Sequence, residues 1–316
     1  MARRADLILV LIHLPIANLP VDVFLILGMG LAVGFISGMF GIGGGFLLTP
    51  LLIFIGISPA VVVATVAPQI AAASFTGFLT YWRRRSIDFA LGGMLLIGGA
   101  IGTATGVWVF TMLRSVDMLD LLIAVSYLSL LGTVGVLMIT ESLQAINRAR
   151  HGKPADLRKP GSHAWFHGLP LKMRFKRSRI YVSVIPVWAI GMIIGFVGAI
   201  LGIGGGFVLV PMMIYLLRVP TVTVIGTSMM LTLVTMLAAT VLHATVNHLV
   251  DTLLAGLLMV GGVIGAQFGA QAGHKMRGER LRLLLGVLVL MVGMRFAYEL
   301  VASPEDIFSI RQIGKS

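Results

Sequence analysis

Two glycine clusters carry the residues best suited to binding a ligand through the backbone. Residues 34–52 read GFISGMFGIGGGFLLTPLL, and residues 195–213 read GFVGAILGIGGGFVLVPMM. Glycines interrupt a helix, and the helix that restarts after them presents unpaired backbone N–H groups and the positive end of its dipole. Such an end is a binding site for a small anion. The doubled motif therefore predicts anion recognition at two equivalent helix breaks.

Polar side chains in the neighbouring apolar segments would complete such a site. Hydroxyl and amide groups are neutral hydrogen-bond donors that suit sulfonate or carboxylate oxygens, although a hydroxyl alone more often bonds its own helix backbone. Gln69 has Leu231 as its counterpart in the second half of the chain, so we expect an asymmetric site. The candidate substrate-binding residues are Gly43, Gly44, Gly45, Thr49, Thr65, Gln69, Gly204, Gly205, Gly206, Thr227, Ser228 and Thr232.

Other readings of the glycines are weaker. Phe46 stands where a GxGxxG dinucleotide motif needs glycine, and no Lys-Ser/Thr pair follows as in a phosphate-binding loop. Tight helix crossing is the serious alternative, but duplication beside polar residues favours a site. The sequence has no HExxH, GxSxG, paired carboxylates or cysteine. We therefore predict no enzyme activity, no metal and no cofactor.

His243 and Asn247 form a second polar pair, four residues apart on one helix face. This pair is compatible with a proton relay or an entrance, and equally with a helix cap beside the lipid headgroups.

Composition places the chain in a membrane. Hydrophobic residues make up 58% of it and charged residues 11%, and the mean hydropathy is +1.00; soluble domains carry about 25% charged residues. Apolar runs near the length that spans a bilayer recur at 21–45, 60–82, 89–113, 118–140, 182–217, 222–247, 252–272 and 283–302. We predict an all-α polytopic membrane protein with about 8–10 helical segments.

The net charge of +12 does not indicate nucleic acid binding. The basic residues lie between apolar segments, and residues 148–179 hold ten Lys and Arg against one acid, Asp156. The positive-inside rule explains this pattern, because basic loops stay on the cytoplasmic side of a membrane protein. The partner that the charge implies is therefore the lipid bilayer.

The two halves of the chain form a repeat. We divide the sequence into an N-terminal segment, repeat 1, a basic cytoplasmic linker, repeat 2 and a C-terminal tail, at 1–20, 21–141, 142–181, 182–302 and 303–316. Each repeat also contains an aspartate that reads as a helix N-cap, Asp88 or Asp251. Each cap is followed by a GxxxGxxxG ladder that permits close helix packing.

Charge patterning predicts that the repeats are inverted. The basic turn at 83–88 matches the uncharged loop before Asp251, whereas the thinly charged turn at 114–118 matches the basic turn at 273–282. Residues 182–217 must then begin and end on the same side, because a helix of that length would reach roughly 54 Å across a bilayer of about 30 Å. We predict a helical hairpin broken at each GIGGG. The expected cytoplasmic residues are Arg83, Arg84, Arg85, Lys275, Arg277, Arg280 and Arg282.

The paired GxGGG-F-x-x-x-P hairpins, the Ala-Thr and Gly-Thr that follow them, and the GGxxG helices resemble the TauE/SafE (TSUP) family of sulfite-exporter-like transporters. The resemblance covers about 21–302, and the linker stretch HGLPLKMRFKRSRIY (167–181) is similar to a bacterial subgroup. It implies transport of sulfite, sulfoacetate or other organosulfonates across the cell (inner) membrane. Carried over residue by residue, it points to both glycine triplets and to Thr65, Thr227 and Ser228.

We therefore expect a transporter of small sulfur-containing anions that works by alternating access around a midplane site. Two alternatives stay open: a transporter of small carboxylates, and a membrane scaffold or receptor subunit that acts through its basic linker. The sequence leaves open whether the chain is a monomer or a homodimer.

Overall fold

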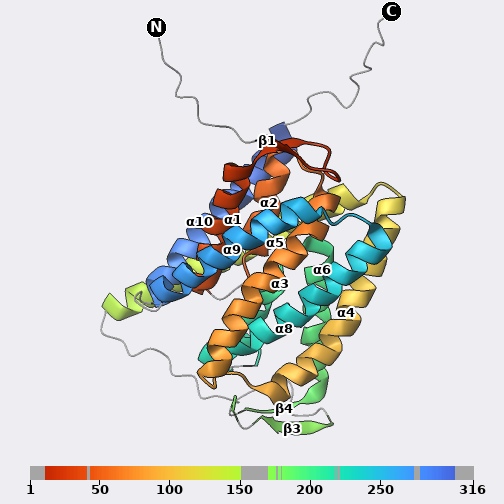
Figure 1. Cartoon of the computed structure of the whole chain (residues 1–316). Helices are drawn as coiled ribbons and strands as arrows, with labels where there is room; N and C mark the ends of the chain where they lie inside the picture. Colours follow the sequence, from red (N-terminus) through yellow and green to blue (C-terminus); the bar gives the residue numbers. More distant parts are fainter. Residues whose placement is uncertain are drawn as a thin grey trace, which may run out of the picture.

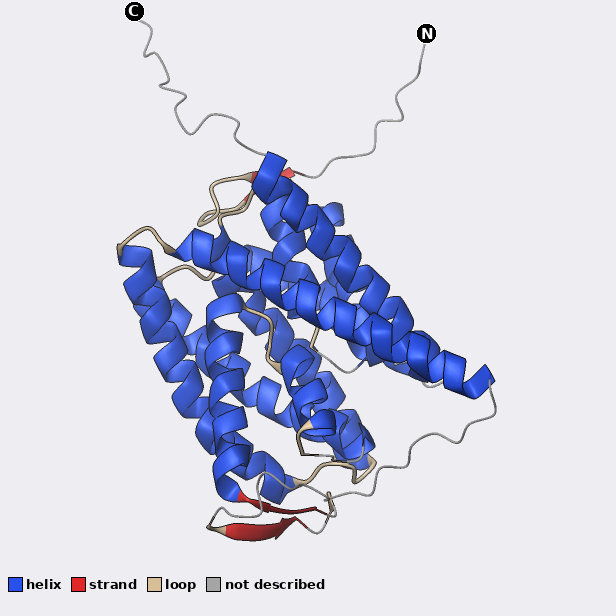
Figure 2. Cartoon of the chain, turned by 180° about the vertical axis from the view of Figure 1, so that it is seen from behind, coloured by secondary structure: helices blue, strands red, loops and turns tan. Residues whose placement is uncertain are grey.

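The computed structural model describes residues 11–40, 43–150, 170–175, 177–178, 180–217, 219, 221–273 and 278–302. Most of these residues are helical, with two short antiparallel strand pairs (Figure 2). In chain order, the elements are β1 (Leu11–His13), β2 (Pro20–Asp22), α1 (Val23–Phe40), α2 (Gly45–Phe54), α3 (Pro59–Arg83), α4 (Phe89–Ser115), α5 (Leu119–Arg150), β3 (Lys172–Phe175), β4 (Ile180–Ser183), α6 (Val184–Leu201), α7 (Gly206–Tyr215), α8 (Thr221–Leu242), a π-helix (His243–Asn247), α9 (Thr252–Gly273) and α10 (Gly278–Ala302).

Six helices of the described chain are long and apolar enough to cross a membrane: α3, α4, α6, α9, the 119–140 part of α5, and α8 with its π-helical extension. Helices α1, α2 and α10 contribute shorter apolar stretches. This confirms the prediction of an all-α polytopic membrane protein. Lys275, Arg277, residues 151–169 of the linker and the tail 303–316 lie outside the described residues.

Each glycine cluster turns the chain back on itself. A Cβ placed on Gly44 would lie 3.3 Å from a methyl of Val33, and a Cβ on Gly205 would contact the side chain of Ile194. Both contacts bring together residues separated by three helical turns, which a continuous helix would hold roughly 16 Å apart. The predicted helical hairpins, α1–α2 and α6–α7, are therefore confirmed.

The two hairpins enter from opposite ends of the molecule (Figure 1). Strands β1 and β2 precede α1 at one end, and β3 and β4 precede α6 at the other. Helices α2 and α7 each have ten residues, which corresponds to about 15 Å, half the thickness of the hydrocarbon core. Each is therefore too short to cross the hydrocarbon core, and the opposite directions of the two hairpins confirm the inversion predicted from charge.

The strand pairs extend each repeat beyond the boundaries drawn from the sequence. The Asp251 carboxylate accepts hydrogen bonds from the Leu254 N–H at 3.2 Å and the Ile16 N–H at 3.0 Å. Equivalently, the Asp88 carboxylate accepts from the Leu91 N–H at 3.1 Å and the Ser178 N–H at 2.9 Å. Each aspartate is the predicted N-cap of its helix, and it also holds the strand turn that opens the other repeat.

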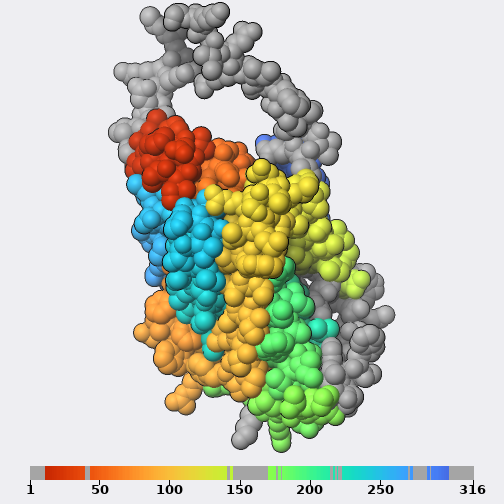
Figure 3. All heavy atoms as spheres, turned by 90° about the vertical axis from the view of Figure 1, so that its right-hand side faces the viewer, coloured from red at the N-terminus to blue at the C-terminus, as the bar shows by residue number. Residues whose placement is uncertain are grey.

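The ladder helices join the repeats crosswise. Helix α1 packs along α9, and α6 packs along α4, while α3 and α8 cross at the centre. On one face α4 lies between α6 and α8 (Figure 3). The ladder glycines lie against backbone carbonyls of the partner helix: Gly98, Gly102 and Gly106 against Trp188, Met192 and Phe196, and Gly261, Gly265 and Gly269 against Leu27, Leu31 and Phe35. The ladders are packing faces, as predicted.

Candidate functional site

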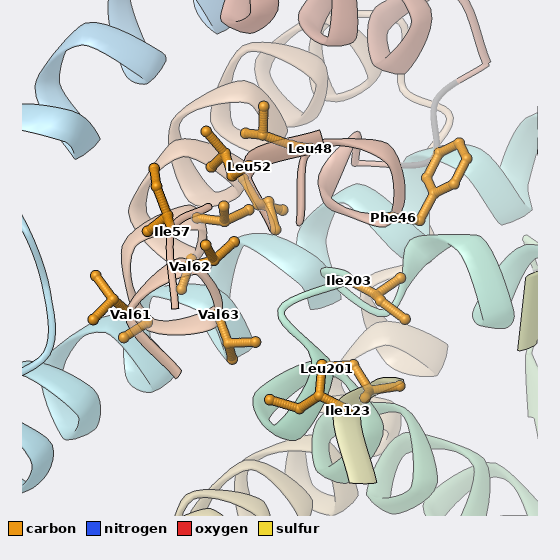
Figure 4. Packing of buried hydrophobic residues seen from close by; sticks show 14 of the residues in the cluster. Phe46, Leu48, Leu52, Ile57, Val61, Val62, Val63, Ile123, Leu201 and Ile203 are labelled. Carbon is orange, nitrogen blue, oxygen red and sulfur yellow. The ribbon is translucent and has the colours of Figure 1, made fainter. Parts of the chain in front are cut away.

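The two hairpin tips meet inside the protein. Phe46 and Phe207, the residues that follow the glycines, stack with ring centroids 4.4 Å apart and planes 9° from parallel. A Cβ on Gly45 would lie 2.5 Å from the carbonyl oxygen of Gly202, so one tip rests directly on the backbone of the other. Phe46, Ile203 and Leu201 lie in the buried cluster at this junction (Figure 4).

Gly43 and Gly204 face a shared space between the tips. Both have positive φ, +92° and +80°, which side chains rarely adopt. A Cβ on Gly43 would meet Thr232 at 3.5 Å, Ile70 at 3.6 Å and the Ser74 hydroxyl at 3.9 Å. A Cβ on Gly204 would meet the same Ile70 and Thr232 side chains. Two glycines, the Ile70 side chain, the methyl group of Thr232 and, beside Gly43, the Ser74 hydroxyl therefore surround one space, which we call the tip junction.

The polar groups of this region lack partners. Within the described part of the chain, Ser74 Oγ, Thr232 Oγ1 and both amide atoms of Gln69 are buried and make no hydrogen bond. A buried polar atom left unpaired costs about 1–3 kcal/mol, so native proteins keep few of them. Ser74 and Thr232 flank Gly43. Both hydroxyls therefore keep their hydrogen-bonding capacity beside the hairpin tips.

Gln69 occupies a neighbouring position. A Cβ on Gly262 of α9 would lie 2.5 Å from the Gln69 side-chain nitrogen, so the amide presses against the seam where α9 meets α1. Its counterpart, Leu231, packs in the equivalent place against Gly99 of α4. The predicted asymmetry is therefore present: repeat 1 has the unpaired amide of Gln69 where repeat 2 has the apolar side chain of Leu231.

The electrostatics of the junction come from the backbone. Helices α2 and α7 begin at Gly45 and Gly206. Among the described residues, no hydrogen bond engages the N–H groups of Phe46 and Phe207 in their first turns. Each helix start carries roughly half a positive charge. Asp88, Asp251 and His243 are buried and ionisable, but none of them supplies an atom nearest to a Cβ on the tip glycines. The junction is thus weakly positive and offers neutral donors.

Several of the predicted residues have other partners. The Thr49 hydroxyl donates to the Gly202 carbonyl at 3.4 Å and ties the hairpins together. The Thr65 hydroxyl accepts from the Asp251 N–H at 3.0 Å, and the Thr227 hydroxyl accepts from the Asp88 N–H at 3.3 Å. The Ser228 hydroxyl donates to the carbonyl of Ile225 at 2.8 Å. The structure therefore brings together Gly43, Gly204 and Thr232 and keeps these four hydroxyls engaged elsewhere.

Two remaining predicted glycines shape the turns. Gly44 and Gly205 also have positive φ, +62° and +67°, but a Cβ there would meet Ser37 and Ile194 of their own hairpins. Gly206 is the first residue of α7.

Sequence reasoning left Ser74 and Ile70 out of the candidate set. They lie four residues apart and share one face of α3, and Ile70 is the repeat counterpart of Thr232. An alignment of α3 with α8 would have selected Ile70, because Ile70 is the repeat counterpart of Thr232, which was in the candidate set. Ser74 has no such signal, since its counterpart is Met236.

A separate polar chain runs from the second hairpin to the β1–β2 end. His243 bonds the Ala199 carbonyl at 3.2 Å and Asn247 at 3.2 Å, and Asn247 accepts from Thr111 at 3.0 Å. These groups sit in or beside the π-helix, a form that is frequent at functional sites. The stretch from Thr227 to Asp251 is one residue longer than its counterpart, and the π-helix accommodates the extra residue.

Comparison with known families identifies the chain at this point. The family model described as "Sulfite exporter TauE/SafE" matches residues 26–296. This protein belongs to the TauE/SafE family. No solved structure matches the chain.

Members of the family similar to this chain come from several bacteria. It is 26% identical to the probable membrane transporter protein YunE of Bacillus subtilis, covering 86% of this chain and 96% of that protein. It is 30% identical to a probable membrane transporter protein of Xylella fastidiosa, covering 85% and 92%. Family membership and the apolar helices together indicate a multi-pass membrane transporter.

Proposed function

We propose that this protein moves small sulfur-containing anions, such as sulfite, sulfoacetate or other organosulfonates, through the tip junction. The observation that carries this proposal is the pair of buried, unpaired hydroxyls, Ser74 and Thr232, beside two positive-φ glycines at helix starts. The name of the family, sulfite exporter, supports the class of substrate.

The chemistry of the junction suits a compact oxyanion. Two helix starts supply roughly one positive charge in total, and Ser74 and Thr232 each supply one O–H donor. Neither contribution requires a buried Lys or Arg, whose desolvation would be costly. The methyl groups of Ile70 and Thr232 line the space beside both glycines, so in this proposal the anion is bound by a few donors within an otherwise apolar lining.

In this proposal, the inverted arrangement of the two hairpins provides alternating access. Each hairpin opens toward a different end and reaches the junction near the membrane centre, so motion of one hairpin against the other exposes the junction to one side at a time. Thr49 and Gly202 form one link that such a motion would break and reform.

The test is a pair of isosteric substitutions on α8. Thr232→Val removes the unpaired hydroxyl, whereas Thr235→Val removes a hydroxyl that bonds its own helix at the Leu231 carbonyl, 2.9 Å away. A hydrogen bond to a charged group contributes about 1.5–3 kcal/mol, so Thr232→Val should weaken transport by about ten- to hundredfold. Thr235→Val should transport normally, and thermal unfolding should show that Thr232→Val folds as stably as the wild type.

The assay is uptake into proteoliposomes of sulfite, sulfoacetate, taurine, acetate and phosphate, with and without a pH gradient. Transport of a sulfur oxyanion or sulfonate that Thr232→Val alone weakens to this extent would support the proposal. Transport of acetate in preference to every sulfur anion would favour the carboxylate alternative. If no solute were transported, the result would favour the alternative of a membrane scaffold or receptor subunit. Equal transport by Thr232→Val and Thr235→Val would show that the Thr232 hydroxyl at the tip junction does not bind the substrate.

A further inference from the structure

A second basic feature lies away from the tip junction, at the β3–β4 end. A pocket of about 670 Å³ opens there between the end of α3, the start of α4 and the β3–β4 turn. Its lining combines three guanidinium groups with apolar and aromatic side chains: Leu79, Trp82, Arg83, Arg85, Ile87, Phe89 and Arg177. We call it the arginine pocket.

The fold brings these arginines together from distant segments. Helix α3 ends at Arg83, and Arg85 adopts a φ of +53° as the chain reverses toward α4. Asp88 then binds the backbone and side chain of Ser178, at 2.9 and 2.7 Å. This contact fixes the strand turn that carries Arg177, whose guanidinium donates to the Ile87 carbonyl at 3.4 Å.

The inverted repeat provides an internal comparison. At the β1–β2 end, His248 has a φ of +51°, and the Asp251 carboxylate accepts a hydrogen bond from the Ala17 N–H at 3.4 Å, as the Asp88 carboxylate does from the Ser178 N–H. The positions equivalent to the three arginines are Val246, His248 and Ile16. This arrangement therefore forms without a cluster of cations, and the arginines are not needed to build it.

The pocket has the character of a lipid headgroup site. Among the described residues, no acidic side chain lines it, and the nearby Asp88 is buried with its carboxylate engaged by Leu91 and Ser178. Trp82 and Phe89 are about half exposed in the same lining as the cations, so the pocket offers apolar and basic surface side by side. Arginine binds phosphate oxygens through paired N–H groups.

We propose that the arginine pocket binds the phosphate of an anionic phospholipid. The basic residues at the β3–β4 end place it on the cytoplasmic side by the positive-inside rule, where anionic headgroups are recognised by basic pockets between helices. This site is distinct from the tip junction and does not depend on which solute is transported.

The test is native mass spectrometry of the purified full-length protein with phosphatidylglycerol or phosphatidylcholine. Each arginine near an anionic surface contributes roughly a fivefold gain in affinity. The double variant Arg83→Gln/Arg177→Gln should therefore bind phosphatidylglycerol about 25-fold more weakly. Arg174→Gln is the matched control, because it removes a charge from exposed β3 outside the pocket. Thermal unfolding of each variant checks that it is folded.

Selective binding of phosphatidylglycerol by the wild type and Arg174→Gln, but not by the folded double variant, would support the proposal. An Arg174→Gln loss as large as that of the double variant would overturn it, because diffuse surface charge would then explain the binding. Complete displacement of the lipid by millimolar inorganic phosphate would also overturn it and assign the pocket to a free anion.

Discussion

At the scale of single residues, the surroundings of each positive-φ glycine decide its role. Gly43 and Gly56 have nearly the same φ, +92° and +96°. A Cβ on Gly43 would enter the tip junction, whereas a Cβ on Gly56, in the turn between α2 and α3, would meet nothing within 4 Å. A substitution at either glycine strains the backbone, but only a substitution at Gly43 also fills space in the tip junction.

We predict that Gly43→Ala abolishes or strongly reduces transport and that Gly56→Ala does not. Both variants lose about 1–2 kcal/mol of stability, because alanine is strained at positive φ, and only the first adds a methyl group beside Ser74 and Thr232. Proteoliposome uptake together with thermal unfolding measures both effects. Equal transport by the two variants would show that the space beside Gly43 is not used by the substrate.

At the scale of elements, the ladders set how closely the repeats approach. A Cβ on Gly265 of α9 would contact the Leu31 carbonyl of α1, while a Cβ on Gly256 of the same helix would meet nothing within 4 Å. We predict that Gly265→Ala lowers the unfolding temperature in detergent, because the α1 and α9 backbones must separate and lose packing contacts. Gly256→Ala should leave it unchanged or raise it; a matching decrease in both variants would mean that helix contact is not the cause.

The end of α6 gives a second prediction at this scale. Its final carbonyls are bonded by side chains from other helices, among them the Tyr127 hydroxyl, which donates to Leu201 at 2.7 Å. Leu290, the counterpart of Tyr127 in α10, has no such group. Tyr127→Phe should cost about 1–3 kcal/mol, because it leaves a buried carbonyl unpaired. Chemical unfolding measures the loss, and Tyr181→Phe, at the exposed position of β4, is a control expected to show none.

At the scale of the whole molecule, the inverted architecture fixes which surfaces share a side of the membrane. Ser115, at the end of α4, and Lys172, on β3, are both exposed and lie at opposite ends (Figure 1). The chain contains no cysteine, so a single introduced cysteine reports one position without background.

We predict that an impermeant maleimide labels Ser115→Cys in intact cells and labels Lys172→Cys only after the membrane is opened. The reason is that the basic β3–β4 end is retained in the cytoplasm. The opposite labelling pattern would reverse the orientation and move the arginine pocket to the outer leaflet.

Local patterns of the sequence predicted much of this architecture. Long apolar runs specified the spans, and the repeated GIGGG clusters specified where two of them break, because glycine acts on the helix that contains it. The charge alternation between the repeats specified their inversion, since each loop is sorted by its own charge. The spacing of the ladder glycines marked the packing faces, because residues four apart share one side of a helix.

The tertiary structure alone decided which polar groups meet. Thr65 and Thr232 look alike in sequence, yet the first binds the backbone of Asp251 and the second has no partner within the described chain. The difference arises from the depth and direction at which α3 and α8 cross between the hairpins, a relation between distant segments that no local pattern encodes. Tertiary packing also brought Ser74 to Gly43 within repeat 1, and it brought Arg177 to Arg83 where the two repeats meet.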